Sequence, residues 1–356
     1  PIATDSSLRV MLSRWENGAA QPEPVYVLLL EEALGLDARS LGIEPDQDSP
    51  NGDLTSLVQR NFFRSGANEA VLHYFERQLA EHTRLDNAVG PGFILDTAIA
   101  QLAQLTQLSD SGPSHVMSLS GRFSEFAGWL HQDLGNDGEA LRLTARAAEL
   151  AEGAGDHERA TYNLMRKANV LTTTGDDARL ALSVGSAALE RARVAHPRLV
   201  PVCLRQQALA SARLRDEGAM RAALDQAVDL ASVSVDETDS VSPYCTTSYL
   251  HMEAALGWLV LGNAVAAEEA CAQALAVWPA GLDRDRTLCL TRHGAALTQL
   301  RRVDEACHAA MLAVDSVRSA PSGRALHMLR VIVGRLRPFN RNAAVRDLIE
   351  AVADVA

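Results

Sequence analysis

The distribution of hydrophobic and polar positions predicts an all-α protein. Apolar residues recur at intervals of three and four through most of the 356-residue chain, and short polar turns separate these stretches. No run of alternating β-branched residues is long enough to predict a strand, and no run of apolar residues is long enough to predict a membrane span. Aromatic residues are 4% of the chain, so the core must be built from many small side chains, as in closely packed helices.

The first periodic segment, SLRVMLSRWENG at Ser7–Gly18, predicts a helix. Its apolar side chains form one stripe: Leu8, Met11, Leu12 and Trp15. A serine before the stripe can cap the start of the helix, and the glycine can end it in the left-handed conformation. Two further short helices are expected, at residues 24–34 and 37–41.

The rest of this helix surface carries side chains that contact phosphates and base edges in DNA-binding proteins. The candidate DNA-binding residues are Arg9, Ser13, Arg14 and Asn17. On pattern alone, a short amphipathic docking helix without a DNA role explains the segment equally well.

The exact residues of this segment indicate a protein family more specifically than its hydrophobic pattern does. SRWENG, followed by Pro24 and Tyr26, then LL…LG and a closing SLG, resembles the Cro/repressor-type (Xre-like) helix-turn-helix of actinomycete transcriptional regulators. The resemblance covers residues 1–43. It implies that the SRWENG helix is the recognition helix, that Trp15 packs inside the head, and that the protein is a homodimer on DNA. This family places two further helices before the recognition helix, where this chain has only Pro1–Ser6, so the head is either truncated or completed from elsewhere.

The segments after the head differ in composition. The acidic stretch EPDQDSPNGDLT predicts a linker over residues 44–56. Two opening helices are expected within residues 57–110, near 67–85 and 92–108, followed by a loop with the sequence SDSGPSH. Residues 111–356 are expected to form helical repeats.

Self-similarity in this last region predicts repeated helix pairs. Small residues recur at spacings of 40, 40, 47 and 39, at Gly128, Ala168, Ala208, Ala255 and Gly294. Twelve or thirteen residues after each of them begins a pair of positions seven apart, filled by alanine except at Met220: 140 and 147, 181 and 188, 220 and 227, 267 and 274, 306 and 313. Short side chains let antiparallel helices approach closely, and such units bury their apolar faces by stacking into an α-solenoid. The alternative is a helical bundle in which the alanine spacing is accidental.

The pattern resembles the tetratricopeptide (TPR) repeat, with a period longer than 34 residues. A DNA-reading head joined to such an array resembles actinomycete regulators of development or secondary metabolism. This resemblance implies a DNA-binding transcriptional regulator whose repeats sense a ligand or peptide, or mediate protein contacts and oligomerisation. The alternative function is a helical-repeat interaction scaffold without DNA binding.

In TPR arrays the first helix of each pair lines the concave face. We count along each of these helices from the position twelve residues before the pair of positions seven apart, and take as candidates seven of the side chains that should face inward: Arg122, Glu125, Trp129, Asn163, Arg166, Arg205 and Tyr249. Guanidinium groups bind carboxylates and peptide carbonyls, so we expect a peptide, a small anionic ligand or a protein partner in this groove. The alternative is that these arginines pair with Glu or Asp on neighbouring helices and support the superhelix.

The net charge, the cysteines and the absence of catalytic motifs make several classes of function less favoured. The formal net charge of −12 argues mildly against nucleic acid unless cations gather on one face. Five cysteines are scattered without a C-x-x-C pair, and no signal peptide is visible, so we expect reduced thiols and a cytoplasmic location. The chain has no glycine-rich nucleotide loop, no metal-ligand spacing and no distinct Ser/His/Asp set. We therefore expect no catalytic residues, metal, cofactor or enzymatic activity.

Overall fold

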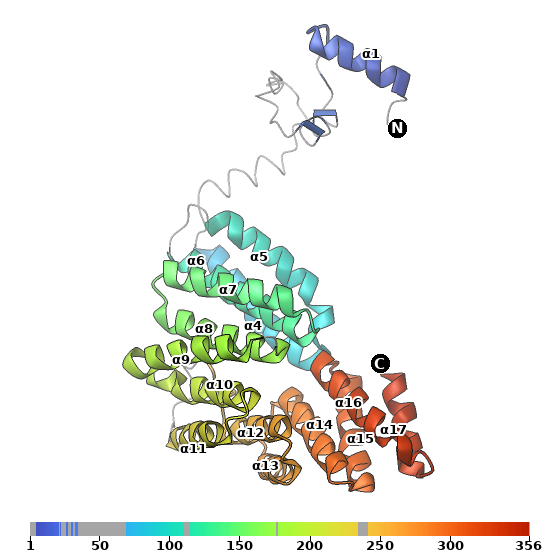
Figure 1. The fold of residues 1–356 in the computed structure, drawn as a ribbon. Helices are drawn as coiled ribbons and strands as arrows, with labels where there is room; N and C mark the ends of the chain where they lie inside the picture. The colour runs from blue at the N-terminus through green and yellow to red at the C-terminus, as the bar shows by residue number, and fades with distance from the viewer. Residues whose placement is uncertain are drawn as a thin grey trace. The chain divides into compact units, whose positions relative to one another are not determined.

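Figure 1 shows the computed structural model of the protein as a series of helices joined by short turns. The structure describes residues 5–20, 22, 26–27, 30, 33–34, 69–109, 114–175, 177–233 and 241–355. All regular elements within these ranges are helices, which confirms the all-α fold class. None of the helices described there has the length and apolar character needed to cross a membrane. The chain divides into two compact units, Pro1–Arg64 and Ser65–Ala356.

The first unit contains the predicted first helix. This helix, α1, spans Asp5–Glu16 and so begins two residues before the expected start. Gly18 ends it with a φ of 65°, the left-handed conformation expected from the sequence. Trp15 is half-buried, and its ring centroid lies 5.4 Å from that of Tyr26. The described parts of 26–34 are helical, whereas the expected helix at 37–41 and the linker at 44–56 lie outside the described residues.

The second unit opens with α4 (Glu69–Val89) and α5 (Leu95–Ser109), joined through a short 3-10 turn. In the described part of the chain, six antiparallel helix pairs follow: α6 (Ser114–Asp133) with α7 (Asp137–Gly153), α8 (His157–Thr174) with α9 (Ala178–Ala195), α10 (Val200–Arg213) with α11 (Glu217–Val233), α12 (Thr247–Leu261) with α13 (Ala264–Ala276), α14 (Asp283–Gln299) with α15 (Val303–Ser319), and α16 (Gly323–Leu336) with α17 (Ala343–Asp354). Each pair stacks on the next, which gives a TPR-like helical-repeat array.

The small residues identified in the sequence explain how closely these helices pack. All ten positions of the seven-spaced pairs are fully buried, and so are Ala168, Ala208 and Ala255. At Gly128 a Cβ atom would lie 3.0 Å from Thr144 Oγ1 and 3.2 Å from the carbonyl oxygen of Ala140. A larger side chain at such a place would push the two helices of the pair apart.

The array also closes on itself. In Figure 1 α16 lies near the ends of the opening helices of this unit, although they are far apart in the sequence. Two glycines stand at the contact. A Cβ atom at Gly323 would overlap the carbonyl oxygen of Asp133, at the end of α6, and a Cβ atom at Gly90 would overlap that of Pro321. Side chains are thus excluded where the start and the end of the array meet, which lets their backbones approach closely.

Candidate functional site

A cavity of about 1230 Å³ lies inside the array. Its wall is formed mainly by the first helices of the pairs, α6, α8, α10, α12, α14 and α16, together with the opening helix α4. Cavities for drug-sized ligands are usually about 300–1,000 Å³. This cavity therefore has room for a larger ligand, such as a short peptide.

Most of the groove residues expected from the sequence meet in this cavity. Five of the seven line it: Arg122, Glu125, Trp129, Arg166 and Tyr249. Asn163 and Arg205 are not among the lining residues and are buried within the helix packing. Arg205 lies 3.6 Å from Glu253, so it has the helix-supporting position that the alternative interpretation of these arginines describes.

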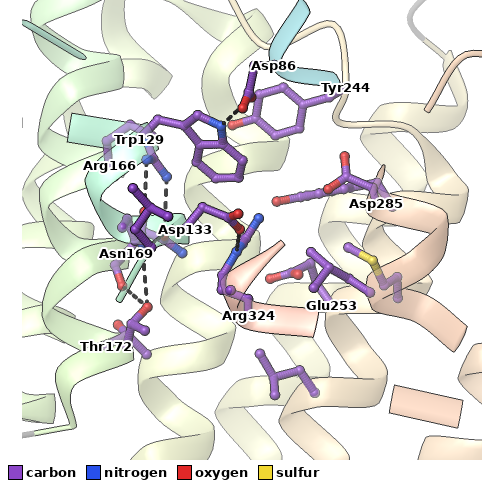
Figure 2. A pocket seen from close by; sticks show the side chains of 18 of the residues that line it. Asp86, Trp129, Asp133, Arg166, Asn169, Thr172, Tyr244, Glu253, Asp285 and Arg324 are labelled. Atoms are coloured by element: carbon purple, nitrogen blue, oxygen red, sulfur yellow. Dashed lines mark hydrogen bonds and ion pairs between the residues drawn. The ribbon is translucent and has the colours of Figure 1, made fainter. Parts of the chain in front are cut away.

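A polar network joins the first helices of the first two repeats. Arg166 Nε lies 3.3 Å from Glu125 Oε1, and its Nη2 donates a 2.9 Å hydrogen bond to Gln132 Oε1. Its guanidinium carbon lies 5.1 Å from the centre of the Trp129 ring. Gln132 Nε2 in turn donates to Asn169 Oδ1 at 2.9 Å. Figure 2 labels Trp129, Arg166 and Asn169 of this network. Arg166 is thus both a part of the cavity wall and a link between repeats.

Two further guanidinium groups line this wall, and the carboxylate that pairs with each of them is not a lining residue. Arg122 on α6 is partly exposed, and its nearest carboxylate, Glu76, lies 3.7 Å away. Arg159 on α8 lies 3.4 Å from Asp156. Burial, together with the nearby charge of Arg159, lowers the pKa of Arg122 below its ordinary value. The positive charge of Arg122 is therefore poorly compensated, and an anionic group in the cavity would stabilise it.

A second cluster fastens the two ends of the array around the cavity. Asp86 on α4 forms an ion pair with Arg284 on α14. Asp133 on α6 lies 2.5 Å from Arg284 Nη2 and accepts a 2.8 Å hydrogen bond from Arg324 Nε on α16. Trp129 Nε1 donates to Asp86 at 3.2 Å, and the Arg324 guanidinium stacks over the Trp129 ring at 4.4 Å. We call these residues the closing cluster, and Figure 2 shows four of them: Asp86, Trp129, Asp133 and Arg324.

The two carboxylates of the closing cluster differ in their electrostatics. Burial raises the pKa of Asp86 above its ordinary value, and Arg284 only partly opposes this effect. Burial alone would also raise the pKa of Asp133, but the attraction of Arg324 and Arg284 outweighs it and lowers the pKa. Asp133 is therefore the carboxylate that holds its charge most firmly at the closure.

Of the closing cluster, the sequence analysis identified only Trp129. The counting of inward-facing positions covers only fixed places in the first helices of the repeats. The other residues of the closing cluster lie mostly in the opening helix, at a helix end and in the last pair. One signal was present: Asp86 shares the buried face of α4 with Phe75, Leu79 and His82. A charged residue on the apolar stripe of a helix indicates a buried partner elsewhere in the fold.

The candidate DNA-binding residues are described in part. Ser13, Arg14 and Asn17 are exposed on and just after α1, and Asn17 Nδ2 donates a 2.6 Å hydrogen bond to the carbonyl oxygen of Ser13. The side chain of Arg9 lies outside the described residues. Their role in DNA binding stays a prediction.

The metal-ligating side chains and the cysteines are the other candidates for a reactive site among the described residues. No group of three or more His, Cys, Asp or Glu side chains in the described ranges could hold a metal ion. All five cysteines are free. Burial raises the pKa of Cys203 and Cys245 to about 12, so both remain protonated thiols near neutral pH.

Comparison with known proteins supports the fold. No protein-family model matches the chain, and no curated protein matches it. Among solved structures, the chain is similar to a Rap protein complexed with competence and sporulation factor, with a TM-score of 0.54 and 12% sequence identity over 99% of this chain and 98% of that one. It also aligns with the apo form of the quorum sensor NprR from B. thuringiensis, at 13% identity over 99% of both chains, but the TM-score of 0.43 is too low to support an inference. The first similarity supports the TPR-like helical-repeat fold.

Proposed function

We propose that this protein is a regulator whose helical array senses a short peptide in the central cavity. The observation that carries this proposal is a large cavity whose wall presents the guanidinium groups of Arg122 and Arg159, each held only by a loose and partly exposed ion pair. A peptide supplies carboxylate and carbonyl groups for these guanidinium groups. It also supplies apolar side chains for the apolar part of the lining, which includes Phe126 and Met252.

The closing cluster suggests how binding becomes a signal. Asp133 and Arg324 line the cavity and also hold the first and last parts of the array together. A ligand that contacts both parts binds the closed array more tightly than an open one. It therefore shifts the population toward closure in proportion to that difference in affinity. The outer surface of the array would then differ between the free and the bound protein.

Peptide binding is tested by titration calorimetry with a pooled library of synthetic pentapeptides and with peptides selected from it. Arg122→Ala is expected to weaken binding at least tenfold and to change the melting temperature little, because its ion pair with Glu76 is loose and partly exposed. The control is Arg142→Ala on the outer helix α7, which removes an exposed pair with Glu139. Failure of every peptide to bind, or equal binding by both variants, would contradict the proposal.

We also propose that the N-terminal segment contributes to a DNA-binding head, which would make the protein a transcriptional regulator. Support comes from the exposed polar face of α1, with Ser13, Arg14 and Asn17, opposite the half-buried Trp15. Fluorescence anisotropy of the full-length protein with selected DNA fragments tests this. Arg14→Ala should lower affinity by about 1–3 kcal/mol if Arg14 contacts a base. A folded full-length protein that retains no DNA would favour the interaction scaffold instead.

A further inference from the structure

One carboxylate that lines the cavity has no ion pair with a described residue. Asp285, in the first turn of α14, lines the cavity and is half-buried. It makes no ion pair and no hydrogen bond through its side chain with any described residue. Four other carboxylates that line the same cavity each have a guanidinium group within ion-pair distance: Asp86, Glu125, Asp133 and Glu253.

The groups around Asp285 do not neutralise it. The charged and titratable groups that act on it come from three helices: Arg324 from α16, Glu253 and Tyr249 from α12, and Arg284 and Arg292 from α14 itself. Each of the three guanidinium groups already forms an ion pair with another carboxylate. Burial therefore raises the pKa of Asp285 despite these cations.

Aromatic side chains line the same cavity. Tyr249 and Tyr244 both line it, and their rings pack edge to face with centroids 5.0 Å apart. Burial raises the pKa of Tyr249, and the negative charge of Asp285 adds to this effect. A cavity lined by both a carboxylate and aromatic rings is a favourable environment for an organic cation.

We propose that Asp285 binds a cationic group of the ligand, an ammonium or a guanidinium, and so fixes the orientation of the peptide in the cavity. This inference rests on the proposed peptide-binding function. Figure 2 shows Asp285 and Glu253 on the side of the pocket opposite Arg166 and Asn169. The cavity thus has two poles, with the guanidinium groups of Arg122 and Arg159 on the α6–α8 wall and a carboxylate without an ion pair on α14. A ligand with a carboxylate and a separate cation matches both poles.

The experiment uses one pentapeptide selected from the pooled library by its affinity for the wild-type protein. Its N-terminal ammonium and a lysine or arginine side chain are the two sources of a cation. The peptide is therefore compared with an N-acetylated form and with a form in which norleucine replaces the basic residue. Titration calorimetry is expected to show that one of these changes weakens binding at least tenfold. Asp285→Asn should weaken binding of the unmodified peptide to a similar extent, and should leave the affinity for the weakened form unchanged.

The matched control is Asp283→Asn. Asp283 is also in the first turn of α14, but it is exposed and does not line the cavity. A role limited to the charge at the helix terminus would be shared by both residues. Unchanged peptide affinity in Asp285→Asn, or equal weakening by both variants, overturns the anchor while peptide binding stands. The anchor is also overturned if Asp285→Asn lowers the affinity equally for the unmodified peptide and for the peptide without the cation. If no peptide from the library binds the folded wild-type protein, the proposed function itself fails and the anchor with it.

Discussion

Replacing Arg284 with alanine is expected to loosen the closure of the array. Arg284 is almost completely buried and forms ion pairs with two carboxylates on different helices, Asp86 on α4 and Asp133 on α6. Its removal leaves both carboxylates with fewer partners. These contacts join residues about 150 to 200 positions apart in the sequence. Their removal should therefore weaken the contact between the two ends of the array, and not the packing within a single repeat.

The magnitude follows from what each carboxylate keeps. Removing one member of a buried ion pair costs about 3–5 kcal/mol, since the remaining charge is left without a partner. Asp133 retains Arg324 and a 3.0 Å hydrogen bond from Ser322 Oγ. Asp86 has a raised pKa and can take up a proton. We therefore expect a loss near the lower limit, about 3 kcal/mol, and a melting temperature lower by about 6–12 °C.

Thermal melts by circular dichroism measure this loss, and small-angle X-ray scattering measures the accompanying increase in the radius of gyration. Arg286→Ala is the control, because Arg286 lies on the same helix and is exposed. It should change stability by less than about 0.5 kcal/mol. The double variant Arg284→Ala, Asp86→Asn also removes the buried charge that Asp86 would carry without its partner, and should recover part of the stability. A melting temperature and a radius of gyration equal to those of wild type would refute the closing role of Arg284.

Other perturbations test the same account. Gly323→Ala should destabilise the protein and enlarge it, since the new Cβ would overlap the backbone of Asp133, whereas Gly334→Ala on the same helix has open space and should be neutral or stabilising by up to about 1 kcal/mol; similar thermal melts and scattering profiles would argue against the close approach. Asp285→Asn should raise the melting temperature at neutral pH, because the buried carboxylate has a raised pKa and its charged form opposes folding. This gain should shrink as the pH falls through the raised pKa and vanish below the ordinary value of 3.8, so a gain that persists in acid would contradict it. Arg205→Ala should lower stability strongly through the loss of its buried pair with Glu253, and a wild-type melt would remove that role.

The repeat architecture could be predicted because it depends on local spacing. Small residues at fixed offsets decide where two neighbouring helices can touch, and the positions at Gly128, Ala168 and Ala208 are buried as expected. The turn after α1 followed from Gly18 for the same reason. These features need only a few residues of sequence to be specified.

The residues of the inner wall were predicted less completely. An error of a single residue in counting along a helix moves the expected inward-facing positions to another side of that helix. In the second repeat the offset to the alanine pair is thirteen instead of twelve, and one residue turns a helix by about 100°. The rule therefore selected Arg166, which lines the cavity, together with Asn163, which does not. The side chains of Tyr162 and Asn169 line it instead.

The closing cluster and Asp285 could not be found from repeat spacing. The meeting of α4 and α6 with α14 and α16 depends on the small rotation that each repeat adds, summed over the array. No local pattern specifies that sum. The unpaired state of Asp285 is likewise a property of the closed array, since it depends on which carboxylates Arg324 and Arg292 already contact.

Hydrogen–deuterium exchange of the full chain, with and without a bound library pentapeptide, tests the central claim most directly. The account places the peptide inside the closed array, where it contacts the first helices of the pairs. It predicts slower exchange in α6, α8 and α14 together, with added protection at the contact between α16 and the end of α6. Protection confined to the outer helices α7, α9 and α11, with no change around the cavity, would contradict it.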